Sequence, residues 1–256
     1  MTNKARTKSR KLMAVASGSD SGLRSSALAE ILQEEIIQGW LSVGESLPSE
    51  RDLMVQYSVS RATVREALRI LGAKGLTEVR RGRLGGSYVL APSTKTISNS
   101  VDLFIQGHDV RFVDLVAVRS AIEPVAAAQA ARFRTEEDLA QLNEMLAEAD
   151  KVIDDIEKFS EWNLHWHLGI VRASQNPLFL SFMTSISSAL YSATEREEFN
   201  LETRKTVAQA HRKITKAIEA GDADAARRRM MRHVTSYAQE LDLSTDVTAR
   251  ALGEAE

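Results

Sequence analysis

The chain has 256 residues, of which 43% are hydrophobic and 27% charged, an ordinary composition for a soluble globular protein. This length is sufficient for two domains, each with a core of its own. No apolar run approaches the length that spans a bilayer, and the N-terminal segment lacks the apolar stretch of a secretory signal, so we expect a cytoplasmic protein. The absence of cysteine excludes disulfides and cysteine-based zinc sites.

The net charge of −2 hides an uneven distribution along the chain. Residues 1–92 contain 14 Lys and Arg against 9 Asp and Glu, whereas the remainder contains 19 against 26. A basic front end joined to an acidic body suggests that only the front end meets a polyanion. A chance distribution would look the same, so charge alone does not decide the question.

The N-terminal third predicts a compact unit of three helices and a hairpin. Residues 1–22 mix Lys, Arg, Ser and Gly without a hydrophobic period and predict a flexible basic tail. A first helix is expected from Ser26 to Gly39, and Ser49 and Ser60 can each cap a further helix. Two β-like runs around a glycine-containing loop then predict a β-hairpin. Residues 23–92 therefore fit a winged helix-turn-helix.

The rest of the chain predicts a purely helical second domain. Residues 93–105, rich in Ser and Thr at their start, are expected to be a linker. Helical periodicity covers residues 106–243, interrupted at Asn176-Pro177 and Gly221-Asp222, and residues 244–256 are expected to be a frayed tail. The predicted fold class is mostly α: a winged helix-turn-helix followed by an all-α helical bundle.

The third predicted helix opens with residues that suit the major groove of DNA. The groove admits one helix, whose N-terminal residues reach base edges and phosphates; here that end runs from Ser60 to Arg65. Arg61 and Arg65 are four residues apart and share the face opposite the apolar stripe. Arg51 can hold the DNA backbone, and the hairpin loop offers Gly82 and Arg83 for a close approach to DNA. Any single arginine could be a solvated surface charge, but their common placement favours DNA binding.

In the helical half, polar residues interrupt apolar stripes. Arg119, Asn163, His167, His211 and His233 each occupy a position where the periodicity predicts a buried side chain. Each histidine alone could be a satisfied core residue. Together, three imidazoles and one amide oxygen would form a site for a divalent transition metal such as zinc, nickel or manganese, and Arg119 would complement a carboxylate ligand.

Two further sequence features stay outside this candidate site. His165 falls on roughly the other face of its helix and His108 lies near the predicted linker, so neither is expected to be a ligand. A further apolar stripe could line a pocket or a dimer interface, and periodicity does not distinguish these; it consists of Phe179, Phe182, Ile186 and Leu190.

The run LPSERDLMVQYSVSRATVREALRILGAKGLTEVRRGRLGGSYV resembles the winged helix-turn-helix of the GntR family of bacterial transcription regulators. This resemblance implies binding to a short palindromic operator as a homodimer. It also implies operator contacts from the residues that match the family pattern, which are Arg51, Arg61, Thr63, Arg65 and Gly82.

The segments VDLVAVRSAIEPVAAAQAA, NLHWHLGIVRASQNPL and AHRKITKAIEAGDADAARRRMMRHV look like the C-terminal helical FCD domain of the FadR-like branch of this family. In many members an Asp or Asn and three His bind a metal beside a small carboxylate effector. Position by position, these are Asn163, His167, His211 and His233. Aspartate is common at the first position, so Asn163 removes one negative charge from the implied site.

Three functions remain to be distinguished. The first is a metabolite-responsive regulator, most simply a repressor, released from its operator by a small acid such as a sugar acid or hydroxy acid. The second is a metal-dependent hydrolase, disfavoured because no H-E-x-x-H motif and no obvious general base are present. The third is an architectural DNA-binding dimer without a metal or effector. Because the hydrolase is disfavoured, we expect that the protein is not an enzyme.

Overall fold

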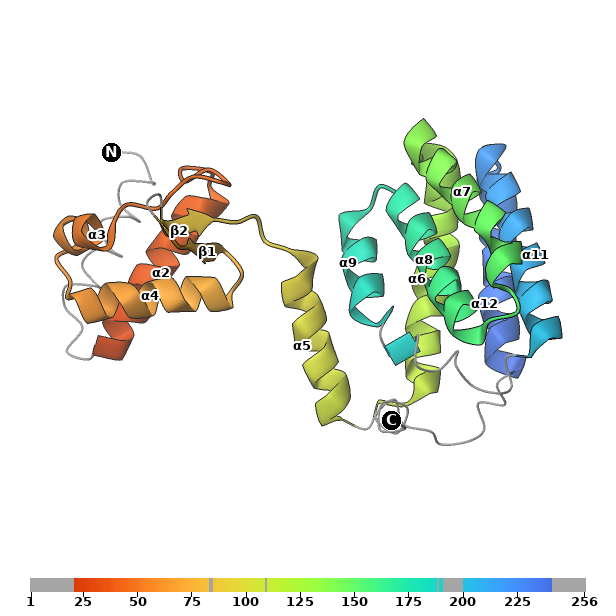
Figure 1. Ribbon diagram of the computed structural model, residues 1–256, viewed down its shortest axis with the longest axis horizontal. Coiled ribbons are helices and arrows are strands. Elements are labelled where there is room, and N and C mark those ends of the chain that lie inside the picture. Colours follow the sequence, from red (N-terminus) through yellow and green to blue (C-terminus); the bar gives the residue numbers. More distant parts are fainter. Residues whose placement is uncertain (1–20, 83–84, 109, 188, 191–199, 241–256) are drawn as a thin grey trace. The chain divides into compact units, whose positions relative to one another are not determined.

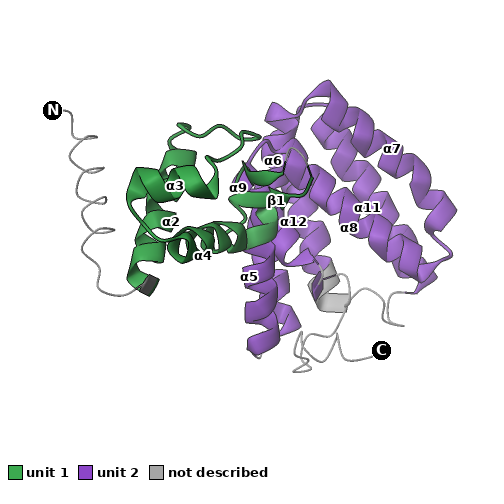
Figure 2. Cartoon of the chain, turned by 60° about the vertical axis from the view of Figure 1, so that its left-hand side comes forward, with its two compact units in different colours: residues 1–96 green, residues 97–256 purple. Residues whose placement is uncertain are grey.

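The computed structural model describes residues 21–82, 85–108, 110–187, 189–190 and 200–240 (Figure 1). The chain divides into two compact units, residues 1–96 and 97–256 (Figure 2). Its mostly helical content, with a single two-stranded sheet in the described part, confirms the predicted fold class. Across the described residues, no helix combines the length and apolar character that crossing a membrane requires.

The first unit contains the three helices and the hairpin that the sequence predicts. The strands pair antiparallel, with Thr77 opposite Val89 and Arg80 opposite Gly86. The elements are α2 (Ser21–Ile37), α3 (Glu50–Tyr57), α4 (Arg61–Ala73), β1 (Thr77–Arg80) and β2 (Gly86–Val89). Helix α2 begins earlier than expected, and its described part already includes the last two residues assigned to the basic tail.

The turn between α3 and α4 is short because its residues adopt unusual and complementary conformations. Ser58 ends α3 in the left-handed region, with φ 52°, and its N–H donates to the carbonyl of Met54. Val59 is buried, and Ser60 then caps α4 by accepting a hydrogen bond from the Thr63 N–H. The capping signals at Ser49 and Ser60 thus act as predicted.

The apolar stripes of these helices meet in one core. Leu28 and Leu32 of α2, Leu53 of α3, and Val64 and Leu71 of α4 are almost completely buried. Because α4 turns its apolar side toward α2 and α3, its opposite side faces solvent. This packing presents the polar face of α4 outward.

The second unit is a helical bundle in which α6 lies against α8, α11 and α12 (Figure 1). Gly221, in the left-handed region with φ 69°, turns the chain between α11 and α12, and the Asp222 carboxylate accepts from the Ala225 N–H. The helices are α5 (Thr94–Gly107), α6 (Phe112–Phe133), α7 (Glu136–Val152), α8 (Ile156–Ala173), α9 (Pro177–Ser185), α11 (Leu201–Glu219) and α12 (Ala223–Glu240).

The segment expected as a linker, residues 93–105, is helical over most of its length as part of α5. Val101 and Ile105 are four residues apart and therefore share a helix face, and both pack on the core of the second unit. The Ser and Thr residues at the start of the segment concealed this apolar face. The expected tail, residues 244–256, lies outside the described residues.

Two residues of α3 provide a direct test of this packing. Leu53 is completely buried, whereas Val55 on the same helix is 76% exposed. We expect Leu53→Ala to lower the free energy of unfolding by about 2–5 kcal/mol, since it removes buried methyl groups and leaves a cavity. Val55→Ala should change it by no more than about 0.5 kcal/mol. Urea unfolding followed by circular dichroism measures both, and equal losses would contradict the assigned orientation of α3.

Candidate functional site

The first candidate site is the exposed face of α4 with the start of α3. Arg61 and Arg65 have side chains that are 68% and 72% exposed, and Arg51 on α3 is also exposed. The cap at the start of α4 and its buried stripe hold these arginines on the solvent side of the unit. The three guanidinium groups are therefore available to phosphates and to guanine edges.

Ser60 and Thr63 have a different role within this surface. Their hydroxyl oxygens lie 2.9 Å apart, and Thr63 is only 4% exposed. The pair satisfies polar groups at the start of α4, where backbone N–H groups lack helical partners. Their clearest contribution in the structure is to hold the N-terminus of the helix.

Glu50 is a residue of this surface that sequence reasoning missed. Its carboxylate oxygens lie 3.9 Å from Arg61 Nε and 4.0 Å from Arg65 Nε. One acidic side chain from the start of α3 thus faces both arginines of α4 and can orient them. The sequence shows Glu50 only as an acidic residue in the first turn of a helix, which is common for reasons of helix capping alone.

The hairpin loop is the second part of this surface. Gly82 has φ 107°, a conformation that side-chain-bearing residues rarely adopt. Arg80 is held within the hairpin, because it pairs with Glu78 at 2.6 Å and its guanidinium lies 4.2 Å from the centre of the Tyr88 ring. Arg83, predicted to contact DNA, lies outside the described residues.

The second candidate site is a cluster of three histidines inside the helical unit. His167 on α8, His211 on α11 and His233 on α12 place ring nitrogens within 4.8 Å of one another. The Nε2 atom of His233 lies 3.2 Å from that of His211 and 3.3 Å from that of His167. Two nitrogens on one tetrahedral zinc are about 3.3 Å apart, since Zn–N bonds are about 2.0–2.1 Å long. The spacing therefore suits a shared metal ion.

Asn163 lies one helical turn before His167 on the same face of α8. It is 4% exposed, and its Oδ1 atom has no hydrogen-bond partner among the described residues. A buried amide oxygen left unsatisfied is unfavourable, and such atoms usually have a partner. Coordination of a metal would satisfy this oxygen, so the four residues fit the ion that the sequence predicts.

Burial keeps the three imidazoles neutral. It lowers the pKa of His167 to about 4, with the charge of Arg119 acting in the same direction. Burial also lowers the pKa values of His211 and His233 well below the usual range, and the neighbouring imidazoles act in the same direction. A neutral imidazole keeps the lone pair that a metal requires, so the cluster is ready to coordinate at neutral pH.

A buried ion pair orients the first of these ligands. Arg119 Nε donates to Glu123 Oε1 at 2.7 Å, and the other Glu123 oxygen lies 2.7 Å from His167 Nδ1. Burial alone would raise the pKa of Glu123, but Arg119 and His167 bring it down to about 2. The carboxylate beside Nδ1 favours the tautomer that carries its proton there, and the Arg119 guanidinium contacts the same ring, so a metal bound at Nε2 would replace this arginine contact.

Trp166 forms one wall of the cluster. Its ring stacks on His211 with centroids 3.6 Å apart, and its Nε1–H donates to Thr215 Oγ1 at 3.2 Å. This contact restricts the orientation of the His211 ring. His108 and His165 are exposed and do not belong to the cluster.

The charge of this site has a chemical consequence. Arg119 and Glu123 cancel each other, while Asn163 and the three neutral histidines contribute no charge. A divalent ion held here would bring two buried positive charges without a balancing carboxylate ligand. Because buried net charge is unfavourable, such a site favours an anion as a further partner.

Two protein-family models match the chain. The model of the bacterial regulatory proteins of the gntR family matches residues 24–89, and the FCD domain model matches residues 114–236. The HTH-type transcriptional regulator LutR of Bacillus subtilis is 34% identical over 78% of this chain and 93% of its own length. The galactonate operon transcriptional repressor of Escherichia coli is 30% identical over 82% and 93%.

A solved structure shows the same fold. The GntR protein of Streptococcus agalactiae superposes with a TM-score of 0.64 at 24% identity, covering 84% of this chain and 99% of that protein. At this identity the likeness concerns the fold alone.

The chain joins a winged helix-turn-helix with outward-facing arginines to a helical FCD domain. This combination is typical of DNA-binding transcription regulators. The chain belongs to the GntR family and carries a C-terminal FCD domain. Proteins of this family are regulators and not enzymes, which confirms the expectation from sequence and excludes the hydrolase.

The buried ion pair of α6 can be tested by stability. We expect Glu123→Ala to lower the free energy of unfolding by about 3–5 kcal/mol, because it leaves the Arg119 charge buried without its carboxylate. The double variant Arg119→Met/Glu123→Met should recover most of this loss, since neither charge then remains. Calorimetry of metal-free protein measures both. If the double variant were as unstable as Glu123→Ala, loss of packing rather than the unpaired charge would explain the effect.

Proposed function

We propose that the protein is a repressor that binds a palindromic operator as a homodimer and leaves it when a small carboxylate binds beside a metal ion in the FCD domain. The observation that carries this proposal is the convergence of three neutral histidines beside a buried arginine, with the unpartnered oxygen of Asn163 one helical turn before His167.

The DNA-binding half of the proposal depends on the exposed arginines. Arg61 and Arg65 can enter the major groove, while Arg51 and the hairpin loop hold the phosphate backbone. Gly82 allows the loop to approach the sugar-phosphate edge closely. In a two-fold symmetric dimer, two copies of α4 would read the two halves of a palindrome.

The metal would be held by Asn163, His167, His211 and His233. Nitrogen and amide oxygen ligands without thiolates are compatible with zinc, nickel or manganese. When bound, the ion supplies positive charge that attracts and orients a carboxylate. Glu123 fixes the His167 ring in the tautomer that coordinates through Nε2, and Arg119 offers a second cationic group beside it.

A sugar acid or hydroxy acid is the effector class that suits this site. The uncompensated charge of a bound ion favours a carboxylate, and adjacent hydroxyl groups can fill coordination positions that the protein leaves open. One of the relatives is named as the repressor of a galactonate operon, and galactonate is a sugar acid. This name supports the class of effector and not its identity.

An exposed apolar face supports the homodimer. Val118 on α6 is 41% exposed, and Leu178 and Phe182 on neighbouring α9 are 62% and 49% exposed. Ile186, which continues the stripe of Phe182, is buried instead. The stripe therefore divides between core and surface, and a second copy of the chain is the partner that would cover its exposed part.

Regulation then follows from linkage between the two sites. If the effector binds the DNA-free arrangement more tightly than the DNA-bound one, operator affinity falls by the same factor.

The alternative is an architectural DNA-binding dimer without a metal or effector. In its favour, the histidines already lie within hydrogen-bond distance of one another and of Arg119. Against it, the Asn163 oxygen and His211 Nδ1 have no partner among the described residues. Dialysis followed by elemental analysis distinguishes the two, because a purely structural network would retain no stoichiometric metal.

The role of Arg65 is tested on an operator selected from a library of random duplexes. We expect Arg65→Ala to weaken operator binding by about 1–3 kcal/mol and to relax the base preference at one position of each half-site. Arg172→Ala, which removes an exposed charge from the FCD domain, is the control and should change neither quantity. Fluorescence anisotropy gives the affinities. An equal loss on operator and on unrelated DNA would show a phosphate contact instead of base reading.

The role of the histidine cluster is tested by His211→Ala. This variant should lose its metal and its response to the effector while operator affinity stays within about twofold of the original, since the DNA-binding residues lie in the other unit. The exposed His165→Ala is the matched control and should keep both properties. Elemental analysis and operator release by a panel of sugar acids are the measurements. Release of His211→Ala from DNA at unchanged effector concentration would place the effector site elsewhere.

A further inference from the structure

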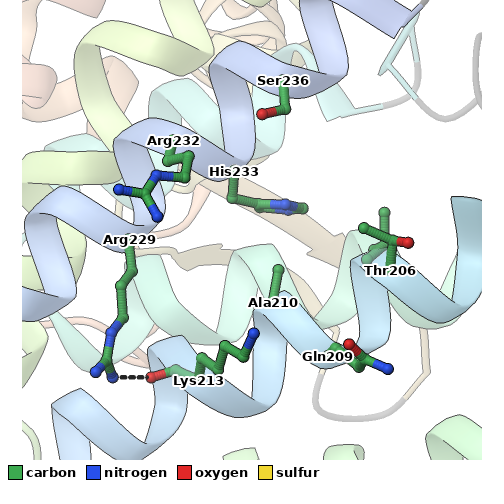
Figure 3. A pocket seen from close by; sticks show the side chains of 9 residues that line it. Thr206, Gln209, Ala210, Lys213, Arg229, Arg232, His233 and Ser236 are labelled. Carbon is green, nitrogen blue, oxygen red and sulfur yellow. Dashed lines mark hydrogen bonds between the residues drawn. The ribbon is translucent and has the colours of Figure 1, made fainter.

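A cleft of about 220 Å³ opens between α11 and α12 on the side of the bundle where His233 lies (Figure 3). Lys213 and Gln209 of α11 line it from one side, and Arg229, Arg232 and Ser236 of α12 from the other. None of the described residues that line it is acidic. The cleft therefore gathers three basic side chains, on two helices in which Lys and Arg outnumber Asp and Glu.

The cations of this cleft are not all used by the fold. The Arg229 guanidinium donates to the backbone carbonyl of Lys213 at 2.5 Å, which ties α12 to α11. Lys213 and Arg232 are exposed, and neither forms an ion pair with a carboxylate among the described residues. Two positive charges thus remain available to a ligand at this point.

His233 belongs both to this cleft and to the metal-binding cluster. It is 9% exposed, compared with 0% for His211 and 3% for His167, so it is the most accessible of the three ligands. Its ring projects into the space between α11 and α12 in Figure 3. The cleft therefore adjoins the proposed centre at His233, which is where a ligand from solvent would first meet the cluster.

We propose that the α11–α12 cleft is an anion subsite that takes the second acidic group of the effector, with Lys213 and Arg232 as its binding residues. This inference rests on the proposed function and narrows it: the preferred ligand carries two acidic groups, one for the metal centre with Arg119 and one for the cleft. A carboxylate and a phosphate share the chemistry that the cleft recognises.

The test measures binding of matched acids to metal-loaded protein through its tryptophan fluorescence, to which Trp166, stacked on His211, contributes. The probes are the pairs butyrate and succinate, hexanoate and adipate, and glycerate and 3-phosphoglycerate. We expect the diacid of at least one pair to bind about tenfold more tightly than its monoacid, and this ratio to shrink at high salt. Comparing this affinity ratio for the glycerate pair with the ratios for the two carboxylate pairs shows whether the cleft takes phosphate or carboxylate.

The double variant Lys213→Gln/Arg232→Gln should abolish the diacid preference while metal content and monoacid affinity remain unchanged. Lys216→Gln/Arg227→Gln removes the same charges from exposed positions of α11 and α12 that do not line the cleft, and should keep the preference. Equal binding of monoacids and diacids, or an equal loss in both double variants, would overturn the subsite and leave the metal centre standing. Absence of both metal and acid binding would overturn the proposed function and this inference with it.

Discussion

The buried pair of Arg119 and Glu123 is the interaction on which the helical domain's chemistry depends. Glu123 neutralises the arginine and places its second carboxylate oxygen 2.7 Å from His167 Nδ1, which favours the proton on that nitrogen. One carboxylate on α6 thereby controls the state of a residue on α8. Without it, the arginine would place an unbalanced charge among three imidazoles that burial keeps neutral.

The two units place arginine in opposite environments, exposed in the first and buried in the second. In the first unit a short turn and a capped helix keep Arg61 and Arg65 exposed to water, where DNA could replace their water contacts. In the second unit the packing of α6 encloses Arg119, which requires a buried partner. The same type of side chain is thus exposed and available for DNA in one unit and buried in an ion pair in the other.

Sequence patterns predicted those features that depend on local spacing. The caps at Ser49 and Ser60, the hairpin and the inward positions of the three histidines all follow from periodicity and capping rules. The helical character of α5 was not predicted, because polar residues at its start concealed the face formed by Val101 and Ile105. A helix that packs only a narrow apolar stripe gives a weak periodic signal.

Features that join distant segments could not be read from the sequence. Glu50 faces Arg61 and Arg65 only because the tight turn brings the start of α3 next to α4. Lys213 and Arg232 likewise come to line one cleft through the packing of α11 on α12. Each of these residues alone looks like an ordinary surface charge, which is the usual role of Lys, Arg and Glu.

The composition of the histidine cluster also determines how it responds to oxidants. Thiolate ligands are lost when peroxide converts them to sulfenic or higher acids, and zinc is then released. The chain contains no cysteine, and the cluster offers only imidazole nitrogens and an amide oxygen. The proposed donor set therefore contains no thiolate that peroxide could remove.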